Sequence, residues 1–270
     1  MYKLIAIDCD GTLLNSKRKI TERTITAIKM ARDSGIKVVL ASARPAYRLK
    51  QFLEPLGLLS SDQYLISFNG GLVCNNTYDE ILFSKSIPTD QVLELIKFGH
   101  QFKTTVFIYA QDCIYSDVDE ETYQLNNPDV NFKVVNFNDL DFSKIPIYKA
   151  VYLNSAEDTK RIRNSLPDEF LGNFETSSSV PQYIEFVSKG ITKSHALECI
   201  GDKLGIKSSE MIAFGDQEND LAMLQYVGYS VAMGNATDEV KKQVDYVTAS
   251  NDEDGVALVI EKITISQPRN

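Results

Sequence analysis

The fold of this chain is decided by the stretch YKLIAIDCDGT at residues 2–12. Its apolar run ends at acidic residues, which is typical of a buried parallel strand whose end reaches a site. Asp8 and Asp10 stand two residues apart at the strand end, so their carboxylates point the same way. Such a pair suits one Mg²⁺ together with a nucleophile and an acid–base group. The plainer interpretation is a polar strand end with an Asp-Gly turn at Gly11, which is common.

Beyond this stretch, segments with strand and helix signals alternate along the chain. Short apolar or β-branched runs predict strands at 2–8, 36–41, 64–67, 211–214 and 229–233. Helical spacing of apolar residues predicts helices at 21–34, 45–57 and 192–204, one from about 218, and one near 253–262. Residues 72–75 and 80–83 flank a turn and predict a β-hairpin. The alternation predicts an α/β fold with a doubly wound, Rossmann-like parallel sheet.

The middle of the chain breaks this alternation. Residues 84–185 hold more than half of the Phe and Tyr side chains, and their helix and strand signals interleave less regularly. We therefore predict a discontinuous core domain at 1–84 and 189–270, and an inserted α+β cap domain at 85–188. The aromatic residues are interpreted as the insert's own core rather than as a stacking platform, because a domain of this size needs apolar filling.

Composition narrows the classes of function. The chain has 270 residues, a formal net charge of −9 and a sequence pI near 4.9. Its acidity disfavours nonspecific binding to nucleic acid or to an anionic membrane, so neither partner is expected. The cysteines lack paired metal-ligand spacing, and no apolar run reaches the ~20 residues of a spanning helix. We expect a cytoplasmic monomer or weak homo-oligomer whose partner is a small molecule.

Two further signals lie near predicted helix starts. Ser42 in ASAR, residues 41–44, offers a hydroxyl and nearby backbone N–H groups to a phosphoryl oxygen. By itself, Ser42 would be read as an ordinary helix cap. Lys193 lies where a cation is unfavourable unless an anion compensates it, although a solvated surface lysine is an equally plain interpretation.

The last signal is GDQEND at 215–220, which follows a predicted apolar strand. Asp216, Asn219 and Asp220 occupy a turn and a helix start, where an acidic side chain can cap the helix or bind a hard cation. A cap accounts for Asp216 but not for the whole cluster. Together the four signals supply a nucleophilic carboxylate, acids for Mg²⁺, a hydroxyl for phosphate and a lysine that balances charge. Phosphoryl transfer through an aspartyl-phosphate requires these groups.

This combination resembles the haloacid dehalogenase (HAD) superfamily. The large insert after FNGG at 68–71, the late lysine and the GDQEND form resemble its Cof-type sugar-phosphate phosphatase family. The motifs at 8–12, 42–44, 193 and 215–220 bracket nearly the whole chain. The resemblance implies a HAD-type phosphoric monoester hydrolase that uses Mg²⁺ to hydrolyse small phosphorylated metabolites, sugar phosphates in particular. The insert would close over the site, exclude water and select the substrate.

The resemblance also implies a role for each acidic residue. Asp8 would attack phosphorus and carry the aspartyl-phosphate. Asp10 would protonate the leaving alcohol and then activate water. Mg²⁺ would be held by the Asp8 carboxylate, the Asp10 backbone carbonyl and Asp216. Asp220 would order water on the metal.

The substrate-binding residues that the resemblance implies are Ser42, Ala43, Asn69, Lys193 and Asn219. Ser42 and Lys193 would hold phosphoryl oxygens. Asn219 would lie near the phosphate or Lys193, and Asn69 near the substrate.

The chain departs from the family pattern at two positions. Ala43 replaces the glycine that is common in the Thr-Gly-Arg form of the second motif, and it narrows backbone freedom beside the phosphate. Ser194 stands where glycine commonly follows the lysine. Neither change removes a chemical group that the mechanism needs.

Two other functions use the same groups. A phosphate-sensing protein would keep the fold without turnover, but Asp10 and the cap-sized insert have no use there. A phosphomutase would return the phosphoryl group to the sugar, and only the resemblance favours hydrolysis over it. His100 and His195 are interpreted as ordinary helix residues, because Asp10 already fills the role of acid and base.

Overall fold

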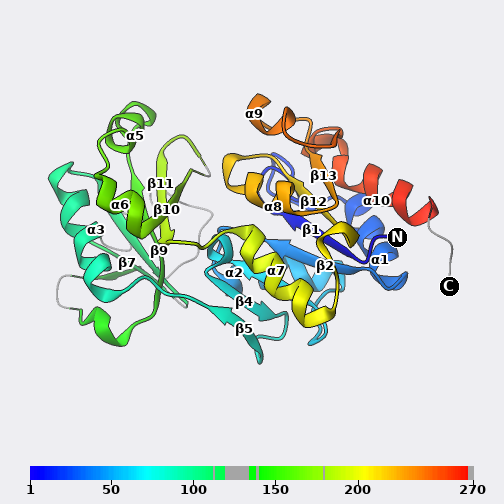
Figure 1. Ribbon diagram of the computed structural model, residues 1–270, viewed down its shortest axis with the longest axis horizontal. Coiled ribbons are helices and arrows are strands. Elements are labelled where there is room, and N and C mark those ends of the chain that lie inside the picture. The colour runs from blue at the N-terminus through cyan, green and yellow to red at the C-terminus, as the bar shows by residue number, and fades with distance from the viewer. Residues whose placement is uncertain (112, 119–133, 138–139, 179, 267–270) are drawn as a thin grey trace. The chain divides into compact units, whose positions relative to one another are not determined.

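The computed structural model describes residues 1–111, 113–118, 134–137, 140–178 and 180–266. The chain divides into two compact units, which we call the core unit (Met1–Ser84 and Thr192–Asn270) and the inserted unit (Lys85–Ile191). Figure 1 shows the elements of both. The second crossing between the units falls after Ile191 instead of after residue 188. Lys189 still belongs to the inserted unit because it donates its backbone N–H to the carbonyl of Asn173 (3.0 Å).

The core unit is built on an eight-stranded sheet of order β14-β13-β12-β1-β2-β3-β4-β5. Its strands are β1 (Leu4–Asp8), β2 (Lys37–Ala41), β3 (Tyr64–Ser67), β4 (Leu72–Asn75), β5 (Ile81–Ser84), β12 (Met211–Gly215), β13 (Tyr229–Ala232) and β14 (Tyr246–Val247). From β14 to β3 neighbouring strands pair in parallel, whereas β3, β4 and β5 pair antiparallel. The strands β1 and β12 are buried at every residue, as expected of apolar runs covered on both faces.

Helices cover both faces of this sheet (Figure 1). On one face α1 contacts α2 and α10, and on the other α7 packs against α8. The bounds are α1 (Glu22–Asp33), α2 (Ala46–Leu56), α7 (Lys193–Leu204), α8 (Leu221–Tyr226), α9 (Asp238–Lys241) and α10 (Gly255–Ser266). The doubly wound α/β fold predicted from the alternation is confirmed. Within the described residues, no helix is long and apolar enough to cross a lipid bilayer.

The parallel register brings three of the predicted motifs to one edge of the core sheet. β1 ends at Asp8, β2 ends just before Ser42, and β12 ends just before Asp216. Because β1 lies between β2 and β12, Asp8 is flanked by the other two motifs. The carboxyl edge of a doubly wound sheet is where such folds bind ligands.

The inserted unit has a six-stranded sheet of order β10-β11-β9-β6-β7-β8. Its strands are β6 (Thr105–Ala110), β7 (Ile114–Ser116), β8 (Val134–Asn136), β9 (Ile147–Leu153), β10 (Phe174–Ser177) and β11 (Tyr183–Ser188). The helices α3 (Thr89–Gln101), α5 (Ala156–Arg163) and α6 (Asp168–Asn173) pack against this sheet. Its buried cluster contains the aromatic residues Phe107, Phe137, Phe142, Tyr152, Phe170, Phe174 and Phe186. For these residues the prediction that the aromatic side chains form the insert's own core is confirmed, and Tyr123 and Phe132 lie outside the described residues.

Candidate active site

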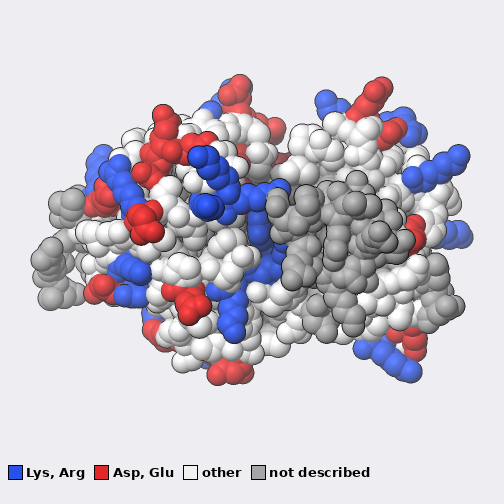
Figure 2. All heavy atoms as spheres, turned by 180° about the vertical axis from the view of Figure 1, so that it is seen from behind, with Lys and Arg blue, Asp and Glu red and all other residues white. Residues whose placement is uncertain are grey.

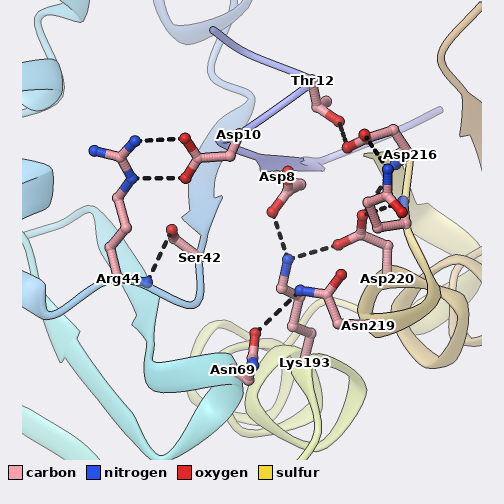
Figure 3. A network of polar contacts seen from close by, with 11 residues as sticks. Asp8, Asp10, Thr12, Ser42, Arg44, Asn69, Lys193, Asp216, Asn219 and Asp220 are labelled. Atoms are coloured by element: carbon pink, nitrogen blue, oxygen red, sulfur yellow. Dashed lines mark hydrogen bonds and ion pairs between the residues drawn. The ribbon is translucent and has the colours of Figure 1, made fainter. Parts of the chain in front are cut away.

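The centre of the site is a buried lysine held between two carboxylates (Figure 3). Lys193 is the first residue of α7, and its Nζ lies 2.5 Å from Asp8 Oδ1 and 2.6 Å from Asp220 Oδ1. Burial lowers the pKa of a lysine, but the charges and hydrogen bonds of Asp220 and Asp8 outweigh it and raise the pKa of Lys193. The buried ammonium group is therefore charged. The interpretation of Lys193 as a solvated surface lysine is wrong, because its side chain is 0% exposed.

Three buried carboxylates converge beside this lysine. Oxygen atoms of Asp8, Asp216 and Asp220 lie within 4.8 Å of one another. Burial and the nearby charge of Asp220 raise the pKa of Asp216 to about 6. The same two causes raise the pKa of Asp8 well above its ordinary value. Since one lysine cannot neutralise three carboxylates, the donor set fits a hard divalent cation such as Mg²⁺.

The turn after β1 and the residue that follows Asp216 hold the Asp216 carboxylate in place. Thr12 donates its hydroxyl to Asp216 Oδ1 (2.9 Å), and Gln217 donates its amide to Asp216 Oδ2 (3.2 Å). Gly11 has a φ of +84°, and a Cβ at this position would collide with the Asp216 carboxylate. The DCDGT turn therefore needs glycine both for its backbone conformation and for room beside Asp216.

The local backbone orients Asp220. Its Oδ2 accepts the backbone N–H groups of Asp216 (3.0 Å) and Gln217 (3.1 Å), while its Oδ1 binds Lys193. A Cβ on Gly215 would collide with the Asp220 side chain, so glycine leaves the space that Asp220 fills. Asp220 thus holds both Lys193 and the turn at Asp216 and Gln217. That Asp220 orders water on a bound metal stays a prediction.

Asp10 pairs with an arginine that the sequence analysis left without a role. Arg44 Nε donates to Asp10 Oδ2 (2.6 Å), and Nη2 donates to Oδ1. Burial would raise the pKa of Asp10, but the hydrogen bonds and charge of Arg44 outweigh it and lower the pKa. In this arrangement Asp10 is ionised, so it can accept a proton but cannot donate one. The sequence contained a signal for this pairing. Arg44 closely follows the end of β2, Asp10 closely follows the end of β1, and these two strands are neighbours in the sheet.

Ser42 is buried in the turn between β2 and α2. Its hydroxyl accepts the backbone N–H of Arg44 (3.1 Å), and its own N–H donates to the carbonyl of Ile66 (2.9 Å). It is not the cap of α2, since Pro45 occupies that position without a side-chain hydrogen bond. A phosphoryl contact at Ser42 or Ala43 stays a prediction.

Asn69 and Asn219 lie against each other in the site (Figure 3). Asn219 Nδ2 donates to Asn69 Oδ1 (3.2 Å). Asn69 has a left-handed backbone (φ 57°), and its N–H donates to the carbonyl of Ser42 (3.1 Å), which ties the ends of β2 and β3 together. Next to it, Gly70 packs so closely on Thr192 that a Cβ would collide with the Thr192 carbonyl. This contact places the start of α7, and hence Lys193, beside the end of β3.

The two histidines have ordinary surroundings. His100 in α3 lies 3.0 Å from an Asp117 carboxylate oxygen. His195 in α7 packs edge-on against Phe83, with ring centroids 4.9 Å apart. These contacts agree with the interpretation of both as helix residues without a catalytic role.

The surface charge of this acidic chain is uneven. Figure 2 shows Lys and Arg side chains gathered in a band on one face, while Asp and Glu side chains are scattered around it. Such a region attracts anions locally whatever the net charge is. The net charge of −9 is thus compatible with a phosphorylated ligand.

A doubly wound core with an inserted unit, and with this lysine–carboxylate cluster at its carboxyl edge, defines a class of α/β hydrolase. Residues 5–260 match the family model of the haloacid dehalogenase-like hydrolases. The chain belongs to this family.

Relatives and solved structures agree with this assignment. The 5-amino-6-(5-phospho-D-ribitylamino)uracil phosphatase YcsE of Bacillus subtilis (strain 168) is 32% identical over 260 residues, which cover 96% of this chain and 94% of YcsE. A haloacid dehalogenase-like hydrolase from Bacteroides thetaiotaomicron matches with a TM-score of 0.85 and 32% identity, covering 97% of this chain and 100% of that one. The HAD subclass IIB sugar phosphatase BT4131 matches with a TM-score of 0.82 and 26% identity, covering 97% and 99%. The prediction of a HAD-type phosphoric monoester hydrolase is confirmed.

Proposed function

We propose that this chain is a Mg²⁺-dependent phosphatase that hydrolyses small phosphorylated metabolites, sugar phosphates among them, through an aspartyl-phosphate on Asp8. One observation carries the proposal: Lys193 is buried between Asp8 and Asp220, and Asp216 completes a cluster that can share one cation. Burying more negative than positive charge is costly. A protein keeps such a costly cluster mainly where the cluster serves a function, so buried acids with raised pKa values mark functional sites.

The proposed reaction has two steps. Asp8 forms a bond to phosphorus while the bond from phosphorus to the alcohol oxygen breaks, and protonated Asp10 gives its proton to that oxygen. Water then attacks the same phosphorus, Asp10 takes a proton from the water, and Asp8 is released together with inorganic phosphate. Lys193 holds Asp8 Oδ1 and so fixes the orientation of the nucleophile. Arg44 lowers the pKa of Asp10 and so keeps it ionised. Arg44 therefore has to move away from Asp10 before Asp10 can carry the proton of the first step.

Two sets of groups surround the reacting atoms: those that would hold Mg²⁺ and those that would bind the substrate. The carboxylates of Asp8 and Asp216 and, by family resemblance, the backbone carbonyl of Asp10 would hold Mg²⁺. When bound, the ion supplies positive charge that offsets the charge of the transferred phosphoryl group. The groups proposed to bind the phosphoryl oxygens and the rest of the substrate are Ser42, Ala43, Asn69, Lys193 and Asn219.

The proposed substrate class is supported by the relatives. The name of YcsE describes a phosphoribityl substrate, and BT4131 is called a sugar phosphatase. We extend this to small phosphate esters for the present chain, with the inserted unit as the cap that selects the alcohol and excludes water. The proposed setting is the cytoplasm, which is supported by Cys9, Cys74, Cys113 and Cys199 being thiols rather than parts of disulfides.

A screen of phosphorylated metabolites with the purified full chain tests this proposal. Sugar phosphates, sugar-alcohol phosphates and nucleotides are offered with Mg²⁺, with chelator, and with Ca²⁺. Both phosphate release and the organic product are measured, and Asp8→Asn is the matched control. We expect release only from the unaltered chain with Mg²⁺, because Ca²⁺ prefers more and longer oxygen bonds and misplaces the reacting groups.

Other outcomes would contradict hydrolysis in distinct ways. A phosphate isomer without free phosphate would indicate a phosphomutase. Tight binding of a phosphate ester without any product would indicate a sensor. Full release in the presence of chelator would remove the metal from the mechanism.

A further inference from the structure

Two asparagines that belong to none of the predicted motifs bind the turn after β1. Asn235 follows β13, and Asn251 precedes α10. Asn235 Nδ2 donates to the carbonyl of Gly11 (2.8 Å), and Asn251 Nδ2 donates to the carbonyl of Leu14 (2.8 Å). We call Asn235 and Asn251 the asparagine brace, because they hold both ends of the turn at residues 11–14.

The brace is itself fixed by the backbone around it. Asn235 Oδ1 accepts the backbone N–H of Asn251 (2.9 Å), so both ends of the Asn235 amide are bound. A backbone carbonyl can only accept and a backbone N–H can only donate, so these two partners determine which way the amide is turned. The backbone N–H of Gly234 donates to the carbonyl of Ala249 (3.0 Å), and a Cβ on Gly234 would collide with residues 249–250. The segment that carries Asn251 is thus packed directly on the residues after β13.

The contact between these two segments extends beyond the brace. Asp252 Oδ1 accepts the backbone N–H of Ser16 (2.9 Å). Asp254 Oδ1 accepts the hydroxyl of Thr21 (2.5 Å). The chain before α10 therefore holds the chain after β1 at several points, of which the bond to Gly11 lies nearest to Asp10 in the sequence.

The peptide that Asn235 holds lies against the proposed metal ligands. Gly11 follows Asp10, whose backbone carbonyl is proposed to bind Mg²⁺. Thr12 donates its hydroxyl to Asp216 Oδ1 (2.9 Å; Figure 3). Gly11 is so close to Asp216 that a Cβ would collide with the carboxylate. A displacement of this peptide would therefore shift both proposed ligands.

The exposure of Asn235 separates position from stability. Its side chain lies at the surface, although it makes two hydrogen bonds. Water can replace an exposed hydrogen-bond partner, so the bond to Gly11 contributes little to the free energy of unfolding. A water molecule is not attached to the rest of the protein, however, and cannot hold the Gly11 carbonyl in one place. The bond therefore serves the position of the turn.

From these contacts we propose that Asn235 is a positioning residue for the phosphatase reaction. Through the carbonyl of Gly11 it keeps the Asp10 backbone carbonyl and Asp216 at the spacing that one Mg²⁺ needs. Mg²⁺ requires near-ideal octahedral geometry, so a small displacement of a ligand weakens its binding. The inference rests on the proposed function and adds to it a residue from a strand end that supplies none of the reacting groups.

Two substitutions at Asn235 in the full chain test the proposal. Asn235→Ala removes both hydrogen bonds, whereas Asn235→Asp keeps the acceptor for Asn251 and loses only the donor for Gly11. In both variants the apparent Mg²⁺ affinity and kcat for a small aryl phosphate should fall by about tenfold, with KM for the ester nearly unchanged. An added carboxylate would by itself attract Mg²⁺, so weaker binding by Asn235→Asp reflects the displaced turn rather than the new charge.

Mg²⁺ binding is also measured without turnover, as the gain in Tm with increasing Mg²⁺ concentration. Without Mg²⁺, the Tm of Asn235→Ala should stay close to that of the unaltered chain, because the side chain is exposed. Gln51→Ala is the matched control. Gln51 is an exposed amide on α2 that donates to the carbonyl of Arg48 (3.0 Å), and its loss should change neither kcat nor the response to Mg²⁺.

Two results would overturn the proposal. Unchanged Mg²⁺ affinity and kcat in both variants would show that the turn keeps its position without Asn235. A loss in Asn235→Ala that Asn235→Asp does not share would show that the bond to Asn251 matters and the bond to Gly11 does not. Failure of the proposed function looks different, because the unaltered chain would then release no phosphate, while the gain in Tm from Mg²⁺ would still be smaller in Asn235→Ala.

Discussion

A lysine is buried against carboxylates in each unit of this molecule, and the two arrangements differ. In the core unit Lys193 lies between Asp8 and Asp220, at 2.5 and 2.6 Å. In the inserted unit Lys149 lies 3.4 Å from Glu185, and both side chains are buried. The first lysine faces more negative charge than it can neutralise, whereas the second forms a one-to-one ion pair with Glu185 among the contacts described for it. An unbalanced buried cluster needs a further cation, and a balanced pair does not.

The surroundings of Lys149 agree with a structural role. Its Nζ lies 4.8 Å from the centre of the Tyr109 ring, which adds a cation–π contact. Along β9 it points to the face opposite Tyr152, whose hydroxyl donates to the carbonyl of Leu95 in α3 (2.5 Å). We therefore expect the loss of Lys149 to affect stability and the loss of Lys193 to affect catalysis.

The largest expected effect comes from removing one carboxylate of each cluster. Asp8→Asn should reduce phosphatase turnover on the order of 10⁴-fold or more, because an amide cannot attack phosphorus. It should not reduce the free energy of unfolding, since it relieves a surplus of negative charge. Glu185→Gln is the counterpart in the inserted unit. It should lower the free energy of unfolding by about 3–5 kcal/mol, because it removes the carboxylate that pairs with a buried lysine.

Rates with a small aryl phosphate measure turnover, and denaturant titrations measure the free energy of unfolding. If Asp8→Asn destabilised the chain as strongly as Glu185→Gln, the two clusters would not differ in charge balance. Normal turnover by Asp8→Asn would remove Asp8 as the nucleophile.

Exchanging each lysine for methionine sharpens the same contrast. Lys193→Met should lower kcat by about 10³-fold, because the nucleophile loses its orientation and the phosphoryl group loses a positive charge. Lys149→Met should leave kcat for an aryl phosphate unchanged and weaken folding instead. The double change Lys149→Met with Glu185→Leu should recover most of that stability, since an apolar pair of similar volume replaces the ion pair. A kcat loss in Lys149→Met, measured on folded protein, would contradict the division of roles.

A smaller effect is expected at Asp10, whose partner is Arg44 rather than the central lysine. Asp10→Asn should lower kcat/KM for a sugar phosphate by about 10²-fold. The loss should be smaller for an aryl phosphate, because a good leaving group needs less protonation. Equal losses for both esters would argue against a proton donor at this position.

The smallest effect concerns the pH dependence of metal binding. The pKa of Asp216 is raised to about 6, above the ~3.9 of an unfolded aspartate. The folded metal-free chain therefore binds a proton that the unfolded chain does not, and this group lowers stability as the pH rises from about 4 to about 6. Mg²⁺ needs the ionised carboxylate, so its apparent affinity should fall by about tenfold per pH unit once the pH drops below about 6.

Thermal unfolding with and without Mg²⁺ checks this dependence. The gain in Tm from Mg²⁺ should be larger at about pH 7.5 than at about pH 5. Equal gains at both pH values would exclude Asp216 as a titrating ligand. The Lys149 and Glu185 variants serve as controls, because they keep the carboxylate cluster of the core unit and should show the same gain in Tm from Mg²⁺ as the unaltered chain.

The strand ends that carry Asp8 and Asp216 could be predicted, because each is determined by residues that are adjacent in the sequence. The apolar run before Asp8 and the one before Asp216 mark two strand ends, and parallel strands bring such ends to one edge. The pairing of Asp10 with Arg44 and the contact between Asn69 and Asn219 were not predicted. Each of these joins residues from different strand ends, and no local pattern contains the direction in which their side chains turn.

By itself, the sequence determined the doubly wound fold class and the set of chemical groups at the strand ends, because hydrophobic period and turn residues act over a few positions. Only the tertiary structure decided that Lys193 is buried and charged rather than exposed, and that Lys149 pairs with Glu185. Charge interactions depend on distance and burial, and both arise when elements far apart in the chain pack together.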